Sequence, residues 1–289
     1  MIPDFVISSL CWVNRNFQHF PGRWRLATWL ASQQARIKQF KAGPIQVGRG
    51  YYLWSNPGDL DGLRYYMNGI NPREPISKLF WAILQPGDCV IDIGANVGYF
   101  TLLGSMLAGP TGVVHAFEAS PVTAGHLQTT RLSTHGNITI HPVAVSDHSG
   151  QIDFSCALPS HTGTSSIRSL GSLEARRISV TCVSLDEYLG DLEKIKLIKI
   201  DVEGAEMMAL RGMQKLLERT CPYIILELTD SFLRDLGSSA DALVTHMTNA
   251  GYTAYPVKDT SRPLTDLSTE QIDVLFVPTG YAVPLPMQT

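Results

Sequence analysis

The hydrophobic positions between residues 73 and 280 fall into short apolar runs that alternate with stretches of helical spacing. The run CVIDI at 89–93 is apolar at almost every position, which predicts a strand buried on both faces in a parallel sheet. Gly94 and Gly98 bound a turn, and 97–108 then have the spacing of a helix packed on that sheet. This alternation predicts an α/β fold with a doubly wound, mostly parallel sheet.

The pattern also divides the rest of the chain. Further strands are predicted at 113–118, 138–145, 151–157, 178–183, 196–200, 223–227, 251–257 and 272–277. Helices are predicted at 76–84, 121–133, 206–217 and 231–250, the last with a break near Gly237. Before residue 73, 23–43 have helical spacing, whereas 44–72 alternate aromatics with turn signals and predict short strands or hairpins. We therefore expect an N-terminal cap or arm (1–72), a main domain (73–280) and a proline-rich tail (281–289).

Composition narrows the class of protein. The chain has 289 residues, 44% of them apolar, and no apolar run approaches the roughly 20 residues needed to cross a bilayer. Five scattered cysteines without a C-x-x-C pair argue against a disulfide framework or a zinc site. The first residues lack a basic leader and carry Asp4 inside their apolar run, which argues against a secretory signal. We expect a soluble, cytoplasmic protein.

The net charge of −3 does not indicate a protein that binds nucleic acid, but the charged residues are distributed unevenly along the chain. Residues 1–49 carry a net charge of +6, and four of the five tryptophans lie before residue 55. Trp and Arg anchor helices at membrane interfaces, and they also anchor protein interfaces. The arm is therefore either a peripheral membrane contact or a cap or homodimer arm packed on the main domain, and we favour the second interpretation.

The turn at 94–98 precedes a helix, and a helix start presents free backbone N–H groups and a positive dipole end to an anionic group. The G-x-G-x-x-G pattern of dinucleotide-binding turns is absent, because the sequence here is GANVG. The spacing D-x-G-x-x-x-G, which begins at Asp92, is instead that of S-adenosylmethionine (SAM) methyltransferases. The turn therefore predicts a site for a ligand with a carboxylate and an ammonium; the alternative is a purely structural strand-turn-helix.

A second strand ends in the carboxylate of Glu118, 24 positions after Gly94. That spacing is close to the one expected of an acid that accepts hydrogen bonds from both hydroxyls of a ribose. The alternative is a solvated glutamate at the end of a strand. NAD also carries a ribose diol, so Glu118 argues against NADP and leaves NAD open.

Three acids, Asp201, Glu203 and Glu206, crowd the junction between the strand at 196–200 and the next helix. Glu227 ends the neighbouring strand at the same sheet edge, where open α/β sheets bind their ligands. In a structural interpretation, Asp201 caps the helix and the glutamates complement its dipole. In a catalytic interpretation, one of these carboxylates takes the proton from a hydroxyl group that reacts at this edge of the sheet. Like-charge repulsion between the carboxylates would raise their pKa values toward neutrality, which suits this role. Carboxylates also suit a divalent metal, but we favour direct carboxylate catalysis.

The sequence resembles the FkbM-type SAM-dependent methyltransferases over roughly residues 72–230. The matching segments are, in the family's order, QPGDCVIDIGANVGYFTLL, VVHAFEASP, ITIHPVAVSDHSG, VSLDEYL, IKLIKIDVEGAEMMALRGM and YIILEL. The combination of GANVG with IDVEGAE is the most specific of these. The resemblance implies a class I methyltransferase fold, Rossmann-like and seven-stranded, with an antiparallel strand inserted at the sheet edge. It does not cover the first seventy residues.

The resemblance also implies roles for individual residues. The expected cofactor-binding residues are Glu74, Asp92, Gly94, Ala95, Asn96, Gly98, Tyr99, Glu118, Ala119, Ser146, Asp147 and Asp201. Ser146 and Asp147 would meet the adenine edge at the end of the third strand, although Asp and Ser also form ordinary turns. His161, Ser165 and Ser166, in a polar loop, are the expected substrate contacts. The expected catalytic residues are Asp201, Glu203 and Glu227.

These observations together predict a SAM-dependent O-methyltransferase that acts on a hydroxyl of a small molecule, a sugar or a secondary metabolite. SAM is the expected cofactor, and no metal is expected. The alternatives are a nucleotide-dependent oxidoreductase and a SAM-binding module without catalysis.

Overall fold

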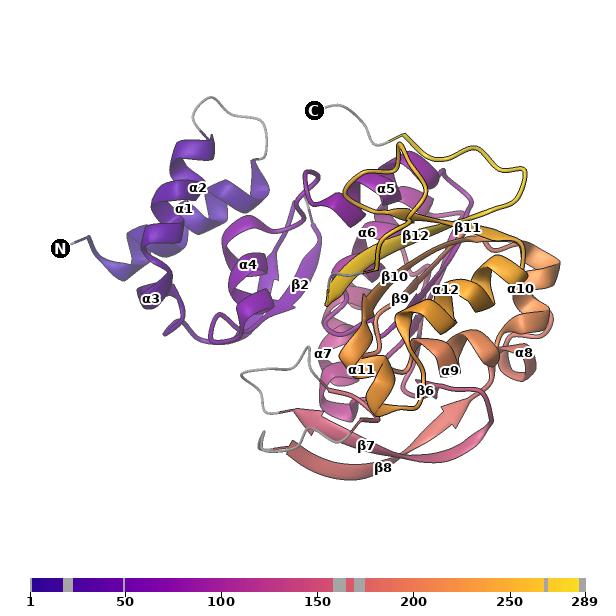
Figure 1. Cartoon of the computed structure of the whole chain (residues 1–289). Coiled ribbons are helices and arrows are strands. Elements are labelled where there is room, and N and C mark those ends of the chain that lie inside the picture. Colours follow the sequence, from indigo (N-terminus) through magenta and orange to yellow (C-terminus); the bar gives the residue numbers. More distant parts are fainter. Residues whose placement is uncertain are drawn as a thin grey trace.

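A seven-stranded sheet forms the centre of the computed structural model, which describes residues 2–17, 23–48, 50–157, 165–168, 175–267 and 270–285 (Figure 1). The strand order is β11-β12-β10-β9-β3-β4-β5. These strands are β3 (Cys89–Ile93), β4 (Val113–Phe117), β5 (Ile138–His141), β9 (Leu197–Ile200), β10 (Tyr223–Thr229), β11 (Tyr252–Pro256) and β12 (Gln271–Pro278). β12 is antiparallel to β10 and β11, and the other pairs are parallel. The predicted doubly wound, mostly parallel seven-stranded sheet is confirmed.

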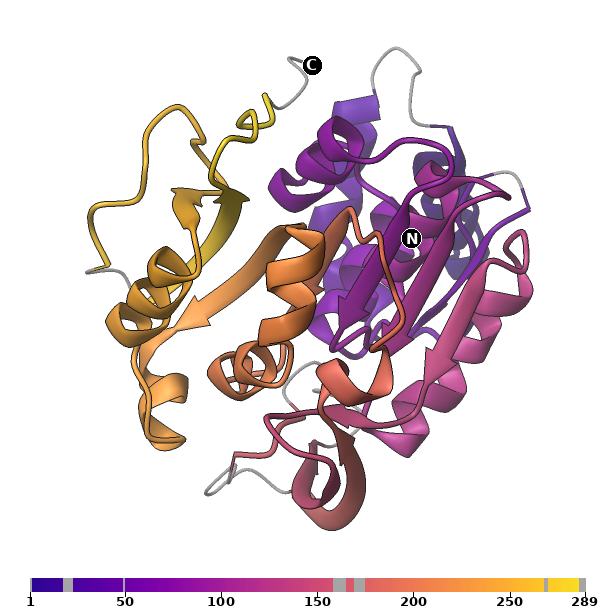
Figure 2. The ribbon, with the colours of Figure 1, turned by 90° about the vertical axis from the view of Figure 1, so that its right-hand side faces the viewer.

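Helices cover both faces of this sheet because successive side chains of a buried strand point to opposite sides (Figure 2). On β3, Val90 packs into one core and Ile91 into the other. The first core includes α5 (Pro75–Ile83), α6 (Tyr99–Ala108) and α7 (Pro121–Leu132). The second includes α8 (Leu185–Tyr188), α9 (Glu206–Arg211), α10 (Gln214–Thr220), α11 (Asp230–Asp235) and α12 (Ala240–Asn249). The sheet is therefore held from both sides.

A smaller sheet lies beside the main one (Figure 1). It contains β6 (Ala144–Val145), β7 (Gly150–Ala157) and β8 (Ala175–Val183) in the order β6-β8-β7. The prediction of one strand over 138–145 is wrong, because β5 ends at His141 and β6 belongs to the small sheet. Pro142 lies at the break and has no N–H for a sheet ladder, and Val143 N donates back to His141 O at 2.9 Å.

The helix predicted over 206–217 is interrupted as well. α9 and α10 are separated at Gly212, where a Cβ would lie 1.9 Å from the carbonyl oxygen of Ser146. The backbone of the turn between the two helices therefore passes directly against the residue that follows β6. The interruption lets the helix pair pack on the end of the small sheet.

The first seventy residues form a layer of helices and one hairpin. Its elements are α1 (Asp4–Asn16), α2 (Arg23–Ser32), α3 (Gln34–Ile37), β1 (Gly43–Gln46), β2 (Tyr52–Ser55) and α4 (Leu60–Asn68). The hairpin β1-β2 confirms part of the prediction for 44–72. The remainder is wrong, because Leu63 and Tyr66, three positions apart, are buried on one face of a helix. The helix predicted over 23–43 is two short helices.

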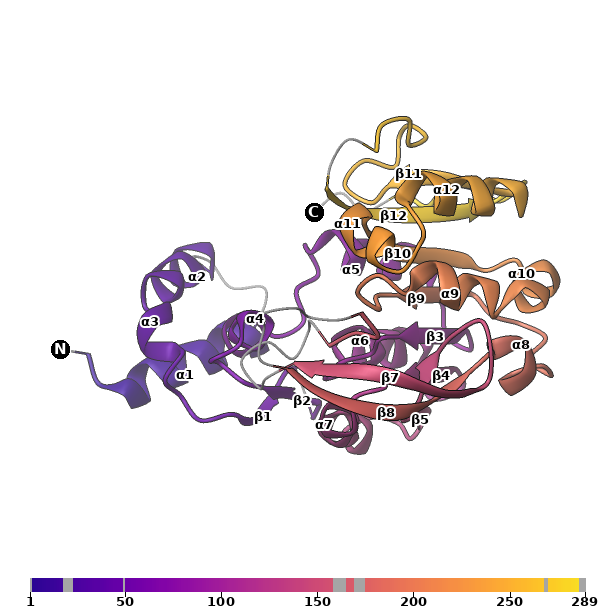
Figure 3. The same cartoon turned by 60° about the horizontal axis from the view of Figure 1, so that its bottom comes forward.

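The N-terminal layer lies at one end of the molecule and packs on α6 and α7 (Figures 1 and 3). The rings of Trp54 and His126 stack with their centroids 4.2 Å apart, and those of Tyr65 and Tyr99 stack at 4.9 Å. The outer side of α1 leaves Phe5 exposed. Whether this layer is a cap, a homodimer arm or a membrane contact stays a prediction, and so do the domain boundaries.

Residues 281–285 follow β12 without helix or strand, as expected of a tail. They still contact the main domain, because the hydroxyl of Tyr223 donates to the carbonyl of Ala282 at 2.8 Å. None of the helices in the described part of the chain is both long and apolar enough to cross a membrane.

We expect Gly212→Ala to destabilise the fold by about 1–3 kcal/mol, because the new methyl group would meet the backbone of Ser146 and force a shift. Thermal unfolding measures the effect. Gly125→Ala is the matched control, since a Cβ at this exposed position in α7 meets nothing within 4 Å and alanine favours the helix. An equal melting temperature for the Gly212→Ala variant and the native chain would contradict the contact.

Candidate active site

A cavity of about 940 Å³ opens at the carboxyl ends of β3, β4, β9 and β10. Its walls include the turn after β3, the acid after β4, the acidic junction after β9, and the N-terminal layer, which contributes Asp61, Arg64 and Tyr65. This is the edge at which open parallel sheets bind their ligands. The cavity therefore joins residues from motifs that are far apart in the sequence.

The glycine turn lies directly against the acidic junction. Gly94 has a φ of 79°, and a Cβ at this position would lie 1.8 Å from the carbonyl oxygen of Asp201. Only glycine allows both the left-handed backbone and this close approach. The turn therefore fixes the distance between the ends of β3 and β9.

The backbone N–H groups of this turn bond within the protein. Gly94 N and Ala95 N both donate to the carbonyl oxygen of Phe117, at 3.0 and 2.9 Å. Asn96 N donates to the Glu118 carboxylate at 2.8 Å. The prediction of free amides is therefore wrong for Gly94, Ala95 and Asn96, because β4 and the acid after it use these donors to hold the turn.

Two other residues of the motif support the turn from outside the cavity. The buried carboxylate of Asp92 accepts a hydrogen bond from the hydroxyl of Thr101 at 2.5 Å. Gly98 has a φ of 95°, and a Cβ there would lie 2.4 Å from the side chain of Leu127. The residues of this motif that line the cavity are Gly94, Ala95, Asn96 and Tyr99.

Glu118 lines the cavity with a carboxylate that is already partly occupied. Its two oxygens accept from Asn96 N and Ser120 N, each at 2.8 Å, so each oxygen keeps a lone pair for another donor. Burial raises the pKa of Glu118 to about 7, against the effect of these two hydrogen bonds. Ala119 lies beside it in the wall. The position suits the predicted contact with a ribose diol.

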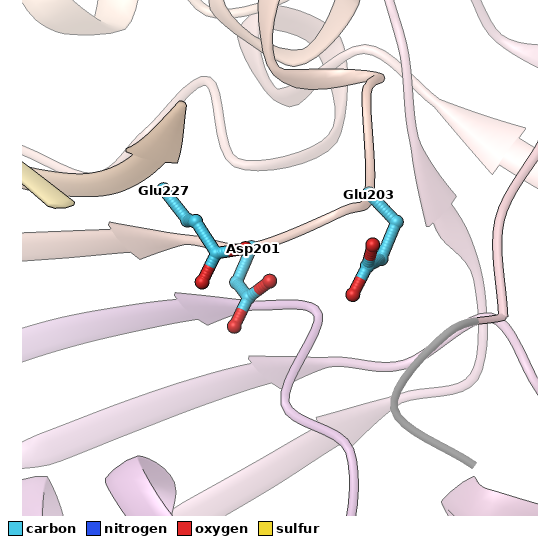
Figure 4. Close-up of side chains that lie close together, drawn as sticks. All are labelled: Asp201, Glu203 and Glu227. Carbon is cyan, nitrogen blue, oxygen red and sulfur yellow. The ribbon is translucent and has the colours of Figure 1, made fainter. Parts of the chain in front are cut away.

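The acidic junction is the most charged part of the cavity (Figure 4). One carboxylate oxygen from each of Asp201, Glu203 and Glu227 lies within 4.8 Å of the other two. Gln271 Nε2 donates to Glu227 at 2.6 Å. Burial raises the pKa of Glu203 to about 8, and the charges of Asp201 and Glu227 act in the same direction. Burial and the charge of Asp201 likewise raise the pKa of Glu227 to about 7, so the predicted shift toward neutrality is confirmed.

The structural interpretation of the junction holds for Glu206 alone. Its carboxylate accepts from Gly204 N at 3.1 Å and from Val202 N at 3.3 Å, so it closes the turn before α9 and does not line the cavity. Asp201 does not cap α9, because the N-cap residue is Ala205. Asp201 and Glu203 are therefore available for chemistry.

Sequence reasoning missed Lys199, which lies on β9 with its side chain only 5% exposed. Its ammonium is 2.8 Å from the Asp201 carboxylate. Burial alone would lower the pKa of Lys199, but the carboxylates of Asp201 and Asp92 outweigh it and raise the pKa, so the side chain stays charged. The available signal was a lysine inside an otherwise apolar strand, two positions before the aspartate and therefore on the same face.

The structure also places the remaining predicted residues. Glu74 lines the cavity, but its carboxylate caps α5 by accepting from Ile76 N at 2.9 Å and Ser77 N at 2.6 Å. Ser146 and Asp147 lie outside the cavity. The carboxylate of Asp147 is 2.8 Å from Nδ1 of His148. The wall near the end of the third strand is formed instead by residues 143–145.

The polar loop is only partly described. Ser165 lines the cavity, and the hydroxyl of Ser166 donates to the backbone oxygen of Glu203 at 2.8 Å. Ser166 is buried and supports the backbone of Glu203, and its role as a substrate contact stays a prediction. His161 lies outside the described residues.

Three converging carboxylates offer the oxygen atoms that a hard divalent cation prefers. Lys199, however, already supplies a positive charge to Asp201 from within the protein. The expectation of direct carboxylate catalysis without a metal stays a prediction.

Several known methyltransferases are similar in sequence to this chain. The chain is 24% identical over 206 residues to the hexuronic acid methyltransferase AglP of Haloferax volcanii, a match that covers 71% of this chain and 80% of the relative. It is 30% identical over 215 residues to methyltransferase 1 of Beauveria bassiana, covering 65% and 82% of the two chains. A shorter match, 40% identical over 67 residues, covers 23% of this chain and 25% of the 31-O-demethyl-FK506 methyltransferase FkbM of Streptomyces tacrolimicus.

The methyltransferase FkbM domain matches residues 92–254, which is more than half of the chain and includes the glycine turn, Glu118 and the acidic junction. The resemblance seen in the sequence motifs is thereby confirmed. The chain belongs to the FkbM family of methyltransferases.

Proposed function

We propose that this methyltransferase transfers the methyl group of SAM to a hydroxyl of a small molecule, a sugar or a secondary metabolite. The observation that carries the proposal is that Glu118 lines the same cavity as the carboxylates of Asp201, Glu203 and Glu227. Glu118 lies at the end of β4, where an acid can bind a ribose diol. It can hold a nucleoside, and the other three can accept the proton that a hydroxyl loses. The name of the Streptomyces relative, which specifies a 31-O-demethyl acceptor, supports an oxygen nucleophile.

The cavity wall offers partners for the nucleoside of SAM. Glu118 keeps acceptor capacity on both oxygens, and Phe117 and the apolar residues 143–145 line the same cavity. These residues would hold the ribose and the adenine. SAM, when bound, supplies an electrophilic methyl group on a sulfonium. The main task of the protein is then to hold the acceptor oxygen against that methyl group.

Methyl transfer to a hydroxyl forms a C–O bond as the C–S bond breaks, and the hydroxyl proton must leave. A well-placed base contributes roughly 10²- to 10⁴-fold to such a step. Burial and neighbouring charges give Glu203 and Glu227 pKa values of about 8 and 7, which suit proton uptake near neutral pH. The products are the methyl ether, S-adenosylhomocysteine and a protonated carboxylate that returns its proton to water.

The oxidoreductase alternative loses its support, because the chain belongs to a methyltransferase family and lacks the glycine pattern of dinucleotide-binding turns. A panel of neutral sugars, hexuronic acids and phenols, each incubated with methyl-labelled SAM, tests the proposal and identifies the acceptor class. Transfer of label to no member above the background without enzyme would contradict it.

We expect SAM and S-adenosylhomocysteine to raise the melting temperature and NAD to leave it unchanged. A ligand present at 100 times its dissociation constant adds about 2.7 kcal/mol to the free energy of unfolding.

Glu118→Gln should weaken SAM binding tenfold or more, because the ribose loses a hydrogen bond to a charged acceptor, which is typically worth about 1.5–3 kcal/mol. Titration calorimetry measures this. Glu193→Gln, at an exposed position, is the control. Equal SAM affinity in the Glu118→Gln variant would remove Glu118 from the site.

Asp201→Asn should lower kcat by a factor of roughly 10² to 10⁴, because the junction loses a charged oxygen facing the cavity. SAM affinity should fall less than in Glu118→Gln, since Glu118 and the wall at 143–145, which would hold the nucleoside, are untouched. Single-turnover transfer from labelled SAM gives kcat, and calorimetry gives affinity. Full activity in this variant would exclude Asp201 from the mechanism.

The pH dependence of kcat should show an acid limb near pH 8. Burial and neighbouring charges raise the pKa of Glu203 to about 8, so the side chain is protonated below that pH and cannot accept a proton. Activity therefore rises with pH through this value and then levels off, with kcat at pH 7 roughly tenfold below the plateau. A profile measured from pH 5.5 to 9.5 tests this. A limb that survives unchanged in Glu203→Gln would assign it to another group.

A further inference from the structure

We propose that Lys199 is a positioning residue for methyl transfer: its ammonium holds the carboxylate of Asp201 in one orientation at the cavity wall and leaves Glu203 as the proton acceptor. This inference rests on the proposed function and divides the roles within the acidic junction. The first observation is the ion pair between Lys199 Nζ and Asp201 Oδ2, at 2.8 Å. Both residues belong to one strand and its end, two positions apart, so the strand itself sets their geometry.

Lys199 is held from several sides. Its backbone pairs with that of Asp92 on β3, and the Asp92 carboxylate contributes to its charge balance. Its ammonium lies 4.8 Å from the centroid of the Phe100 ring, which also lines the cavity. A buried ammonium without a counter-charge is costly, so the pair with Asp201 is strongly enforced. One oxygen of Asp201 is thereby committed to the lysine.

The second observation is the contrast with Glu203. Among the salt bridges of the described residues, Asp201 takes part in one and Glu203 in none. Protonating Asp201 would remove the counter-charge of a buried ammonium, whereas protonating Glu203 relieves repulsion within the junction. Glu227 also lacks a salt bridge, but it already accepts a hydrogen bond from Gln271 Nε2 at 2.6 Å. The proton of an acceptor hydroxyl is therefore taken by Glu203, and Asp201 orients that hydroxyl with its remaining oxygen.

The third observation is the backbone of Glu203. Its φ is 54°, a left-handed conformation that is strained for a residue with a side chain. The hydroxyl of Ser166 holds its carbonyl at 2.8 Å, and the next residue is Gly204 with a φ of 107°. Such strain persists where the surroundings enforce it and concentrates at functional sites. Here it fixes the direction of a carboxylate that faces the cavity (Figure 4).

Several charged groups surround the ion pair of Lys199 and Asp201. Asp201, Asp92 and Glu227 act on Lys199, and Asp273 lies within its electrostatic reach. Glu203 is influenced by Asp201, Glu227, Glu206 and Arg168. Removing the ammonium takes away a positive charge that favours the ionised carboxylates. It therefore raises the pH at which all the carboxylates of the junction are ionised.

Four variants test the inference, with the best acceptor of the labelled-SAM panel. Lys199→Met should lower the plateau kcat at least tenfold, move its acid limb to higher pH and leave the KM for SAM unchanged. Lys199→Arg, which keeps the charge, should restore the position of the limb. Lys196→Met is the matched control, since this lysine lies just before β9 over the ring of Tyr223 and outside the cavity. It should match the native chain in all three quantities.

The double variant Lys199→Met with Asp201→Asn separates positioning from a purely structural role. If Lys199 acts through Asp201, the double variant loses no more activity than Asp201→Asn alone, because the same interaction is removed once. It should also melt above Lys199→Met, since it removes one of the two carboxylates that the lost ammonium balanced, and so it remains measurable if Lys199→Met fails to fold.

A native pH limb and native kcat in Lys199→Met, or strictly additive losses in the double variant, would overturn the positioning role while leaving the proposed function intact. Native enzyme that labels no acceptor would instead overturn the proposed function, and with it this inference.

Discussion

The contact between the glycine turn and the backbone of Asp201 is the constraint on which the site depends. A Cβ at Gly94 would lie 1.8 Å from the carbonyl oxygen of Asp201, so no other residue can occupy that position without separating β3 from the end of β9. Strand pairing alone would align the two strands but would not bring the turn this close. The nucleoside wall around Glu118 and the acids at the end of β9 thus share one cavity, because one residue lacks a side chain.

Charge is the second constraint. The cavity edge collects several carboxylates, and burial together with their mutual repulsion raises the pKa of Glu203 to about 8 and that of Glu227 to about 7. Lys199 offsets this repulsion from inside the sheet, at a position that solvent barely reaches. An exposed lysine would be screened by water and salt and would do so less effectively. The strand therefore carries both the acid and the cation that stabilises it.

Sequence reasoning recovers the parts of this arrangement that depend on order along the chain. Strand identity, the two helical layers and the cavity edge follow from apolar runs and from the positions of Gly94, Glu118 and Asp201. It fails where the outcome depends on contacts between distant segments. The amides of the turn looked free in sequence, yet Phe117 on the next strand takes two of them. Lys199 was missed for a different reason: its partner is only two positions away in the sequence, but only the fold shows that the ammonium is buried and lies 2.8 Å from the carboxylate.

Backbone strain connects these observations. Among the described residues, three that are not glycine have a positive φ. Two of them, Asn96 at 50° and Glu203 at 54°, line the cavity. Such conformations cost roughly 1–3 kcal/mol each and persist only where other contacts enforce them. The Glu118 carboxylate holds the amide of Asn96, and the Ser166 hydroxyl holds the carbonyl of Glu203. The hydrogen bonds that shape the cavity therefore also maintain its strain, so its two walls are set by the folded chain before any ligand enters.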